Sequence, residues 1–206
     1  MASEQETSVA SEPRTLVVLA HPQLATSRVN TALVDAARSV AGVTVHDLYA
    51  TYPDGRIDIA REQGLLRAHD RIVLQFPFYW YAATPLLKQW LDEVFVYGFA
   101  YGTDGSALHG KTLRVATTVG GPSDAYGPGG ANRFSVSDLL RPFDVTAGVT
   151  GMRYEEPFVA YGTRRMDESG LTAQQDAYRA VLRTSSGTSE TARIAPAAAE
   201  ESSLAA

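Results

Sequence analysis

Short apolar or alternating runs recur along this chain, and helix-spaced apolar positions lie between them. The first run, TLVVLA at residues 15–20, is typical of a strand buried on both faces of a parallel sheet. Apolar residues every three or four positions in residues 27–41 then predict a helix with one buried face. The same alternation predicts strands at 15–20, 43–48, 71–76, 113–118 and 152–160, and helices at 27–41, 58–68, 84–95, 135–143 and 172–183.

Capping signals mark the starts of several of these helices. Thr84 before Pro85 predicts an N-cap followed by proline at the first helical position. Ser135 and Asp138 have the spacing of a capping box, and Pro142 should kink or restart the helix that they begin. Further helix starts are expected at Asp58 and at Thr172 with Gln175.

Five strands that alternate with helices predict an α/β fold, a doubly wound five-stranded parallel sheet with helices on both faces. Residues 15–183 make up this one domain. The flanking residues, 1–14 and 184–206, have no hydrophobic periodicity, so we expect two disordered tails.

Composition excludes several classes of protein. The chain carries 18 lysines and arginines against 23 aspartates and glutamates, so no cation excess exists to neutralise nucleic-acid phosphates. The absence of cysteine excludes disulfides and thiol catalysis, and the four histidines show no metal-ligand spacing. Residues 1–12 do not resemble a signal peptide, and the longest uncharged run, 72–87, is too short to span a bilayer. We therefore expect a cytoplasmic protein that binds neither a metal nor nucleic acid.

Ligands of such sheets bind at the carboxyl ends of the strands, so the loops after the first, third and fourth strands are candidate sites. The first loop leads into a helix start at Thr26 or Ser27, where backbone N–H groups and hydroxyls can bind an anion. Arg28 is the only cation in this loop and could add a charge-assisted bond to a phosphate. Alternatively, Ser27 only caps the helix and His21 is a turn residue.

The loop after the third strand is rich in aromatic residues. Ten of the 19 aromatic side chains of this protein lie between Phe76 and Tyr101. Trp90 and Phe95 fit the helical pattern and are expected in the core. The four consecutive aromatic residues at 78–81 cannot all point into one core, so they need a ligand, a partner chain or solvent.

Two glycine-containing segments lead to different predictions. Gly120 and Gly121 follow the fourth strand, where they allow a ligand to approach the backbone closely. Residues 105–112, GSALHGKT, match the phosphate-loop pattern, but that motif requires a strand before it and a helix after it. Because a strand follows here, we interpret this segment as a tight turn.

The three loops together hold a candidate phosphate site, an aromatic platform and a glycine pair. With these features the chain resembles the flavodoxin-like NAD(P)H:quinone oxidoreductases. It is most similar to the branch that includes the ancillary oxidoreductases of glutathione-gated potassium-efflux antiporters and the modulators of drug activity. The likeness covers residues 15–183 and rests on Ala20-His21-Pro22 with Ser27 and Asn30, YATYPDGRID at 49–58, FPFYWY at 76–81, PLLKQWLDEVF at 85–95, GFAYG at 98–102 and LHGK at 108–111.

The resemblance implies a homodimer and a flavin cofactor, FMN or FAD, and the shortness of the chain favours FMN. Val119 interrupts the Thr-Thr-Gly-Gly pattern that is common in the family. By resemblance to the family, the flavin phosphate is bound by Ser27, Arg28, Val29 and Asn30. The edge of the flavin ring is bound by backbone N–H groups of Phe78, Tyr79, Trp80 and Tyr81, and its other side is lined by Thr117, Thr118, Gly120 and Gly121. His21 and Pro77 are further cofactor-binding residues.

The family reduces quinones by two electrons, which implies hydride transfer from NAD(P)H through the flavin to a quinone. If both substrates use one place in turn, the kinetics are ping-pong. Tyr126 is the predicted catalytic residue, because some relatives relay a proton through a tyrosine after the glycines. The aromatic loop carries no carboxylate, which favours hydride chemistry over a single-electron flavodoxin. The alternatives are an azo or flavin reductase of the same fold, or a regulatory flavoprotein that associates with a membrane potassium antiporter.

Overall fold

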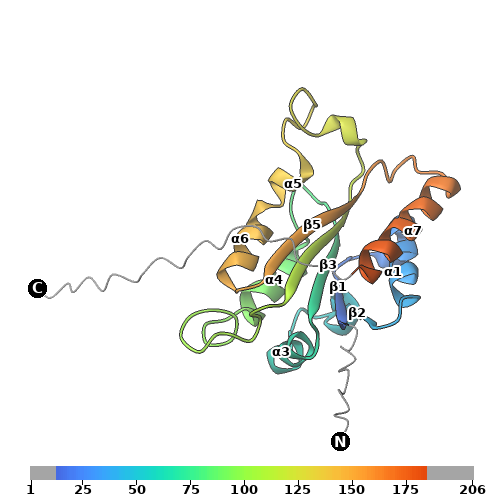
Figure 1. Ribbon diagram of the computed structural model, residues 1–206. Coiled ribbons are helices and arrows are strands. Elements are labelled where there is room, and N and C mark those ends of the chain that lie inside the picture. The colour runs from blue at the N-terminus through green and yellow to red at the C-terminus, as the bar shows by residue number, and fades with distance from the viewer. Residues whose placement is uncertain (1–12, 185–206) are drawn as a thin grey trace, which may run out of the picture.

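The computed structural model describes residues 13–184, which form a five-stranded parallel sheet in the order β2-β1-β3-β4-β5 (Figure 1). This arrangement confirms the predicted doubly wound parallel sheet. The strands are β1 (Thr15–Leu19), β2 (Val43–Asp47), β3 (Arg71–Pro77), β4 (Thr112–Thr118) and β5 (Arg153–Ala160). The α-helices are α1 (Arg28–Arg38), α2 (Leu48–Thr51), α3 (Ile59–Ala68), α4 (Pro85–Val94), α5 (Val136–Leu139), α6 (Arg141–Val149) and α7 (Glu168–Arg183).

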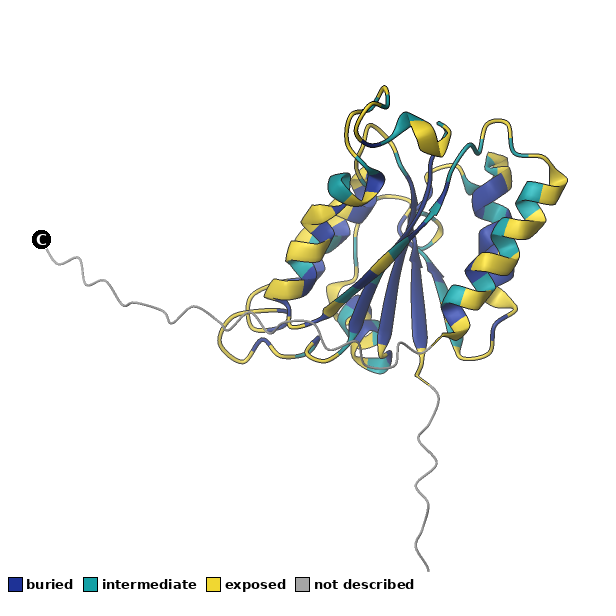
Figure 2. Ribbon diagram, turned by 45° about the horizontal axis from the view of Figure 1, so that its top comes forward, coloured by how far each residue is buried: buried dark blue, intermediate teal, exposed yellow. Residues whose placement is uncertain are grey.

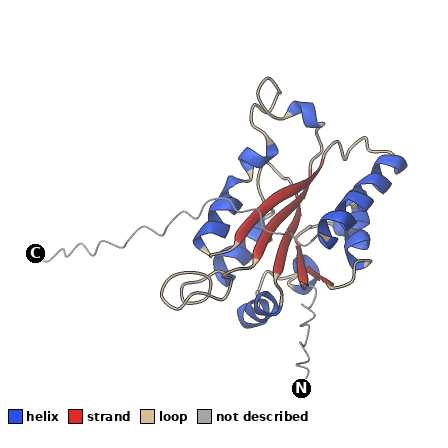
Figure 3. Cartoon of the chain, viewed as in Figure 1, coloured by secondary structure: helices blue, strands red, loops and turns tan. Residues whose placement is uncertain are grey.

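Each face of the sheet is covered by its own group of helices (Figure 3). On one face, α1 and α7 pack against each other and bury Leu33 and Tyr178 over β1 and β3. On the other face, α3 to α6 bury a larger core around Trp90 and Phe76. Because both faces are covered, β1 and β3 are buried along their whole length, as Figure 2 shows, and their sequences are nearly continuous apolar runs.

One helix start and one N-cap hydrogen bond differ from the sequence prediction. α7 begins at Glu168 rather than at Thr172, because the Asp167 carboxylate accepts a backbone N–H of the first turn. Thr84 occupies the N-cap position of α4, but its hydroxyl donates to the Ala20 carbonyl at 3.1 Å and does not cap the helix. That bond ties the start of α4 to the end of β1.

The predicted capping box is present at the start of α5. The Ser135 hydroxyl accepts the Asp138 backbone N–H, and the Asp138 carboxylate accepts the Ser135 N–H in return. The helix breaks at Leu140 and restarts as α6 with Pro142 in its first turn, as predicted. It then runs to Val149, beyond the predicted end at residue 143.

Because all five strands are parallel, the loops after β1, β3, β4 and β5 lie at one edge of the sheet, and the strand order reverses there between β1 and β3. The predicted tails, 1–14 and 184–206, lie almost entirely outside the described residues. In the described part of the chain, no helix is both long enough and apolar enough to cross a membrane.

Candidate functional site

Two adjoining clefts open at the carboxyl edge of the sheet. The first, which we call the helix cleft, has a volume of about 360 Å³, and the second, the aromatic cleft, about 540 Å³. Phe78, Tyr79, Gly120 and Arg164 line both, so the two clefts are continuous. The helix cleft is otherwise lined by His21, residues 26–30, Pro77, Thr118 and Thr163, and the aromatic cleft by Trp80, Tyr81, Gly121, Tyr126 and Asn132.

The start of α1 forms one wall of the helix cleft. Thr31 is the first residue of this helix whose N–H is paired, with the Ser27 carbonyl at 2.9 Å. Within residues 13–184, the N–H groups of Arg28, Val29 and Asn30 have no partner, and the Ser27 hydroxyl does not cap them. Three free N–H groups at a helix N-terminus favour an anion, so the predicted residues 27–30 do meet at a surface that suits a phosphate.

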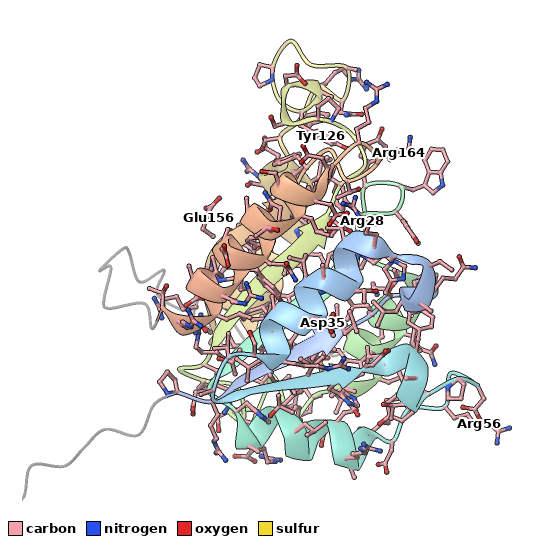
Figure 4. All side chains as sticks on the ribbon, turned by 90° about the vertical axis from the view of Figure 1, so that its right-hand side faces the viewer. Arg28, Asp35, Arg56, Tyr126, Glu156 and Arg164 are labelled. Carbon is pink, nitrogen blue, oxygen red and sulfur yellow. The ribbon has the colours of Figure 1, made fainter. Side chains whose placement is uncertain are left out.

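Arg28 is oriented differently from the prediction. Its guanidinium donates to the Met166 carbonyl at 2.5 Å and to the Glu168 carboxylate at 2.7 Å, at the start of α7. Figure 4 shows Arg28 at the start of α1, below Arg164. The positive charge of Arg28 is therefore already balanced by a carboxylate beside the helix cleft.

Asn30 joins α1 to β4 at the floor of the helix cleft. Its side chain is 2% exposed, and its Nδ2 donates to the hydroxyls of Thr118 at 2.9 Å and Ser27 at 3.1 Å. The Oδ1 atom is buried without a partner among the described residues. Thr117, in contrast, is fully buried and donates to the Phe76 carbonyl at 2.8 Å, so it lies inside the sheet and lines neither cleft.

His21 lies at the end of β1 and lines the helix cleft. Its Nδ1 accepts the Gln23 backbone N–H at 3.1 Å, which leaves the proton of the neutral ring on Nε2. Burial lowers the pKa of His21, although Asp47 acts in the opposite direction. At neutral pH this side chain is therefore an uncharged hydrogen-bond donor.

The aromatic residues after β3 form a tight turn. The Ala82 N–H donates to the Tyr79 carbonyl at 3.1 Å, and the two central residues, Trp80 and Tyr81, have φ angles of 49° and 64°. This left-handed geometry normally favours glycine or asparagine, so two bulky residues store strain here. Trp80 is 90% exposed, and Tyr79 and Tyr81 are each 46% exposed. The prediction that these side chains do not all enter the core is correct, whereas Trp90 and Phe95 are buried as expected.

The backbone of this turn offers fewer free donors than the sequence predicted. The Phe78 N–H donates to the Thr118 carbonyl at 3.0 Å, and the Tyr79 N–H donates to the Pro77 carbonyl at 2.9 Å. Among the residues described, only the N–H groups of Trp80 and Tyr81 in this segment have no partner. Both residues line the aromatic cleft.

The fold agrees with comparisons to known proteins. Residues 13–182 match the family described as the flavodoxin-like fold. The chain belongs to this family.

Its relatives in the flavodoxin-like family include oxidoreductases. The glutathione-regulated potassium-efflux system ancillary protein KefG of Pectobacterium carotovorum is 48% identical over 170 residues, which cover 82% of this chain and 93% of that protein. The uncharacterized NAD(P)H oxidoreductase YrkL of Bacillus subtilis is 46% identical over 158 residues, which cover 77% and 91%. The name of YrkL confirms the predicted class, an oxidoreductase.

Solved structures are similar to this chain as well. General stress protein 14 of Treponema denticola, solved in complex with FMN, has a TM-score of 0.79 at 44% identity, with coverage of 82% of this chain and 98% of that one. An NADPH-quinone reductase of P. pentosaceus has a TM-score of 0.77 at 34% identity, with coverage of 84% and 99%.

Val119, which interrupts the glycine pattern of the family, is part of the core. Its side chain is 1% exposed, its N–H donates to the Ala160 carbonyl at 2.8 Å, and its carbonyl accepts the Thr163 N–H at 3.1 Å. The extra residue therefore extends the pairing of β4 with β5. Gly120 and Gly121 follow it directly at the cleft, where the sequence placed them.

The glycine pair is in contact with two side chains. A Cβ atom on Gly120 would lie 2.9 Å from Nε of Arg164, and one on Gly121 would lie 3.4 Å from the Tyr126 ring. The Tyr126 ring also packs at 5.8 Å from the Tyr161 ring. Burial and the neighbouring Tyr81 raise the pKa of Tyr126 against the opposing charge of Arg164. At neutral pH the Tyr126 hydroxyl is therefore protonated, and it lies in the aromatic cleft.

Three lining residues were missed by the sequence analysis: Thr163, Arg164 and Asn132. Asn132 accepts the Tyr81 hydroxyl at 2.9 Å and so links the aromatic turn to the loop after β4. Thr163 and Arg164 follow β5, whose carboxyl end lies at the same edge as the other three. Ligands of such sheets bind at the carboxyl ends of the strands, so the loop after β5 could have been identified in the same way as the loops after the first, third and fourth strands.

Residues 105–112, which match the phosphate-loop pattern, form a turn, as the sequence analysis predicted. β4 follows it, and its lysine, Lys111, donates to the carbonyls of His69 at 2.5 Å and Arg67 at 3.2 Å. The lysine thus satisfies carbonyl groups at the end of α3.

Proposed function

We propose that this protein is an FMN-dependent NAD(P)H:quinone oxidoreductase. One observation carries the proposal: a helix start with unpaired N–H groups and a strained aromatic turn border one continuous space at the carboxyl edge of the sheet. A phosphate attached to a planar ring fits such a pair of clefts. The FMN complex of a relative with 44% identity and the quinone-reductase name of another support the choice of cofactor and substrate.

The lining residues suit FMN in particular. The free N–H groups of residues 28–30 would hold the phosphate, and the aromatic turn and the Gly120–Gly121 pair would border the ring. The buried Oδ1 of Asn30 needs a donor, which a sugar-alcohol hydroxyl of FMN can supply. FMN is preferred over FAD because the clefts account for a phosphate and a ring without a further surface for adenosine.

Bound FMN would supply hydride transfer between a nicotinamide and a quinone, and the protein would orient both. The hydroxyl of Tyr126 keeps its proton at neutral pH and can donate a hydrogen bond to an acceptor oxygen in the aromatic cleft. We propose that the nicotinamide and the quinone occupy the aromatic cleft in turn. Because NAD(P)H is an intracellular reductant, the protein would act in the cytoplasm.

Initial-rate kinetics test this proposal. We expect FMN-dependent oxidation of NAD(P)H by a soluble quinone, with parallel lines in double-reciprocal plots at several quinone concentrations. Intersecting lines would contradict the shared cleft. Absence of any quinone-dependent rate in the FMN-loaded protein would contradict the activity itself.

We also propose that the protein is a homodimer. α4 and α6 border a groove of about 410 Å³. Its apolar and aromatic lining residues are Leu91, Phe95, Tyr101, Val145 and Val149, and its polar ones are Lys88, Asp92, Thr146 and Thr150. Val145 and Val149 are 65% and 62% exposed, which is unusual for two valines on one helix face. Sedimentation of the wild type as a dimer and of the double variant Val145→Asp, Val149→Asp as a folded monomer would support this interface. A monomeric wild type would contradict it.

A second candidate function follows from the KefG relatives, which are named as ancillary proteins of a potassium-efflux system. In this case the protein would bind and regulate a membrane antiporter, with or without quinone reduction. Co-purification with a potassium-efflux antiporter from the same cell would favour this role. Azoreductases at 13% and 15% identity share the fold alone and do not favour that alternative.

A further inference from the structure

Arg164 lies on the loop between β5 and α7, and three backbone hydrogen bonds fix its position. The Gly162 N–H donates to the Gly121 carbonyl at 2.8 Å, the Thr163 N–H to the Val119 carbonyl, and the Arg165 N–H back to the Gly162 carbonyl at 3.0 Å. The loop is therefore tied to the glycine loop on one side and folded into a turn on the other. Arg164 is held next to Gly120.

The Arg164 side chain lies across the junction of the two clefts. It lines both of them, and its Nε is so close to Gly120 that a Cβ there would collide with it. No carboxylate forms an ion pair with Arg164 among residues 13–184. Figure 4 shows Arg164 beside Tyr126 and above Arg28.

The charges around the helix cleft make this residue significant. A phosphate monoester carries a charge of about −1.5 to −2 at pH 7, whereas a helix N-terminus contributes only about +0.5. Arg28 is neutralised by Glu168, and His21 is uncharged. Without Arg164, the cleft would leave most of the phosphate charge uncompensated.

We propose that Arg164 supplies the positive charge for the phosphate of the bound flavin, a role that the sequence assigned to Arg28. This inference rests on the proposed function, because the ligand phosphate is that of FMN. Arg164 reaches the phosphate from the loop after β5, opposite the N–H groups of α1. Arg28 lies beside the same loop, where the Met166 carbonyl and the Glu168 carboxylate accept its guanidinium.

Paired titrations with FMN and riboflavin test the proposal, because riboflavin has the same ring and sugar alcohol but no phosphate. Flavin fluorescence would be measured with the wild type, Arg164→Ala and the control Arg165→Ala, whose arginine is exposed and lines neither cleft. We expect Arg164→Ala to raise the Kd for FMN about ten- to hundredfold, as for loss of a charge-assisted hydrogen bond, and to leave the Kd for riboflavin unchanged. Arg165→Ala should change neither value by more than about twofold.

The outcomes separate this proposal from the proposed function. Equal weakening of FMN and riboflavin, or no weakening of FMN, in Arg164→Ala would overturn the role of Arg164 while the wild type still bound FMN. Failure of the wild type to bind FMN would overturn the proposed function itself. Arg164→Lys should recover part of the FMN affinity, because it restores the charge but not the planar fork. Thermal unfolding of each variant shows that the fold is intact.

Discussion

Two sets of polar groups in this protein differ in whether their hydrogen bonds are satisfied within the chain. The first surrounds Glu62 on α3, which is fully buried and accepts hydrogen bonds from the Tyr52 hydroxyl at 2.5 Å, the Trp90 indole at 2.8 Å and His46 Nε2 at 2.9 Å. Every donor in this cluster has its partner within the chain. The cluster joins α3 to α4 and to the edge strand β2.

The second set borders the helix and aromatic clefts. Here three N–H groups of α1 and the Oδ1 of Asn30 have no partner in residues 13–184, and Trp80 is exposed in a strained turn. Other buried atoms without a partner in the described part of the chain, such as Thr112 Oγ1, are scattered, whereas these groups lie together around one pair of clefts. Buried polar groups are rarely left unpaired, so the difference distinguishes a structural cluster from a ligand site.

The largest expected effect is on stability and comes from Glu62→Ala. This substitution leaves three buried donors without an acceptor, which should lower the free energy of unfolding by about 3–5 kcal/mol. The Tm should fall by roughly 10 °C in thermal unfolding. The Kd for FMN, measured well below the Tm, should stay within about twofold of the wild type. A large loss of FMN affinity in the folded variant would mean that the two regions are coupled.

The pH dependence of stability sharpens the same contrast. Burial raises the pKa of Glu62, but the hydrogen bonds from His46, Tyr52 and Trp90 outweigh it and leave the pKa below its ordinary value. The charged carboxylate therefore stabilises the fold above the pKa of the unfolded chain, and this contribution is lost as the pH falls through the lower, folded value. The Tm difference between wild type and Glu62→Gln should be largest near neutral pH and shrink below about pH 4. A difference that grew on acidification would contradict a lowered pKa.

Trp80→Ala should have the opposite effects to Glu62→Ala: little change in stability and weaker binding of FMN. An indole that is 90% exposed contributes little to the core, so the free energy of unfolding should change by less than about 0.5 kcal/mol. If the indole borders the ring of FMN, its removal should raise the Kd about fivefold or more. Tyr97→Ala is the matched control, because Tyr97 is 62% exposed on a loop that lines neither cleft. Equal effects of Trp80→Ala and Tyr97→Ala on the Kd for FMN would contradict a role of Trp80 in binding the flavin.

The smallest effect is expected from Glu168→Gln. This substitution removes the carboxylate that neutralises Arg28 and frees its guanidinium for the helix cleft. Because both partners are solvent-exposed, FMN affinity should rise only about two- to threefold, and added salt should abolish the gain. Weaker binding of FMN by this variant would show that the ion pair holds Arg28 in a useful position.

Local patterns predicted the strands, the capping box at Ser135 and the unpacked aromatic turn correctly, because each depends on residues close in sequence. Strand periodicity could also have separated Thr117 from Thr118, since neighbouring strand residues point to opposite faces and cannot both meet one ligand. The family pattern assigned both to the flavin, and only Thr118 lines the cleft.

Other features depend on contacts between distant parts of the chain. Arg28 is paired with Glu168, which is 140 positions away, and no local pattern near Arg28 indicates this partner. Arg164 belongs to a loop without a recognisable motif, and it reaches the cleft because β5 pairs with β4. The Thr84 hydroxyl likewise bonds to the end of β1 rather than to its own helix.

The most direct test of the central claim is an absorbance spectrum of the protein reconstituted with FMN, from about 300 to 600 nm, before and after anaerobic addition of NADPH or NADH. We expect FMN to stay bound through desalting, its visible bands to bleach on addition of the nicotinamide, and the bands to return with a quinone. A protein that takes up no FMN, or whose bound FMN neither nicotinamide bleaches, would contradict the central claim.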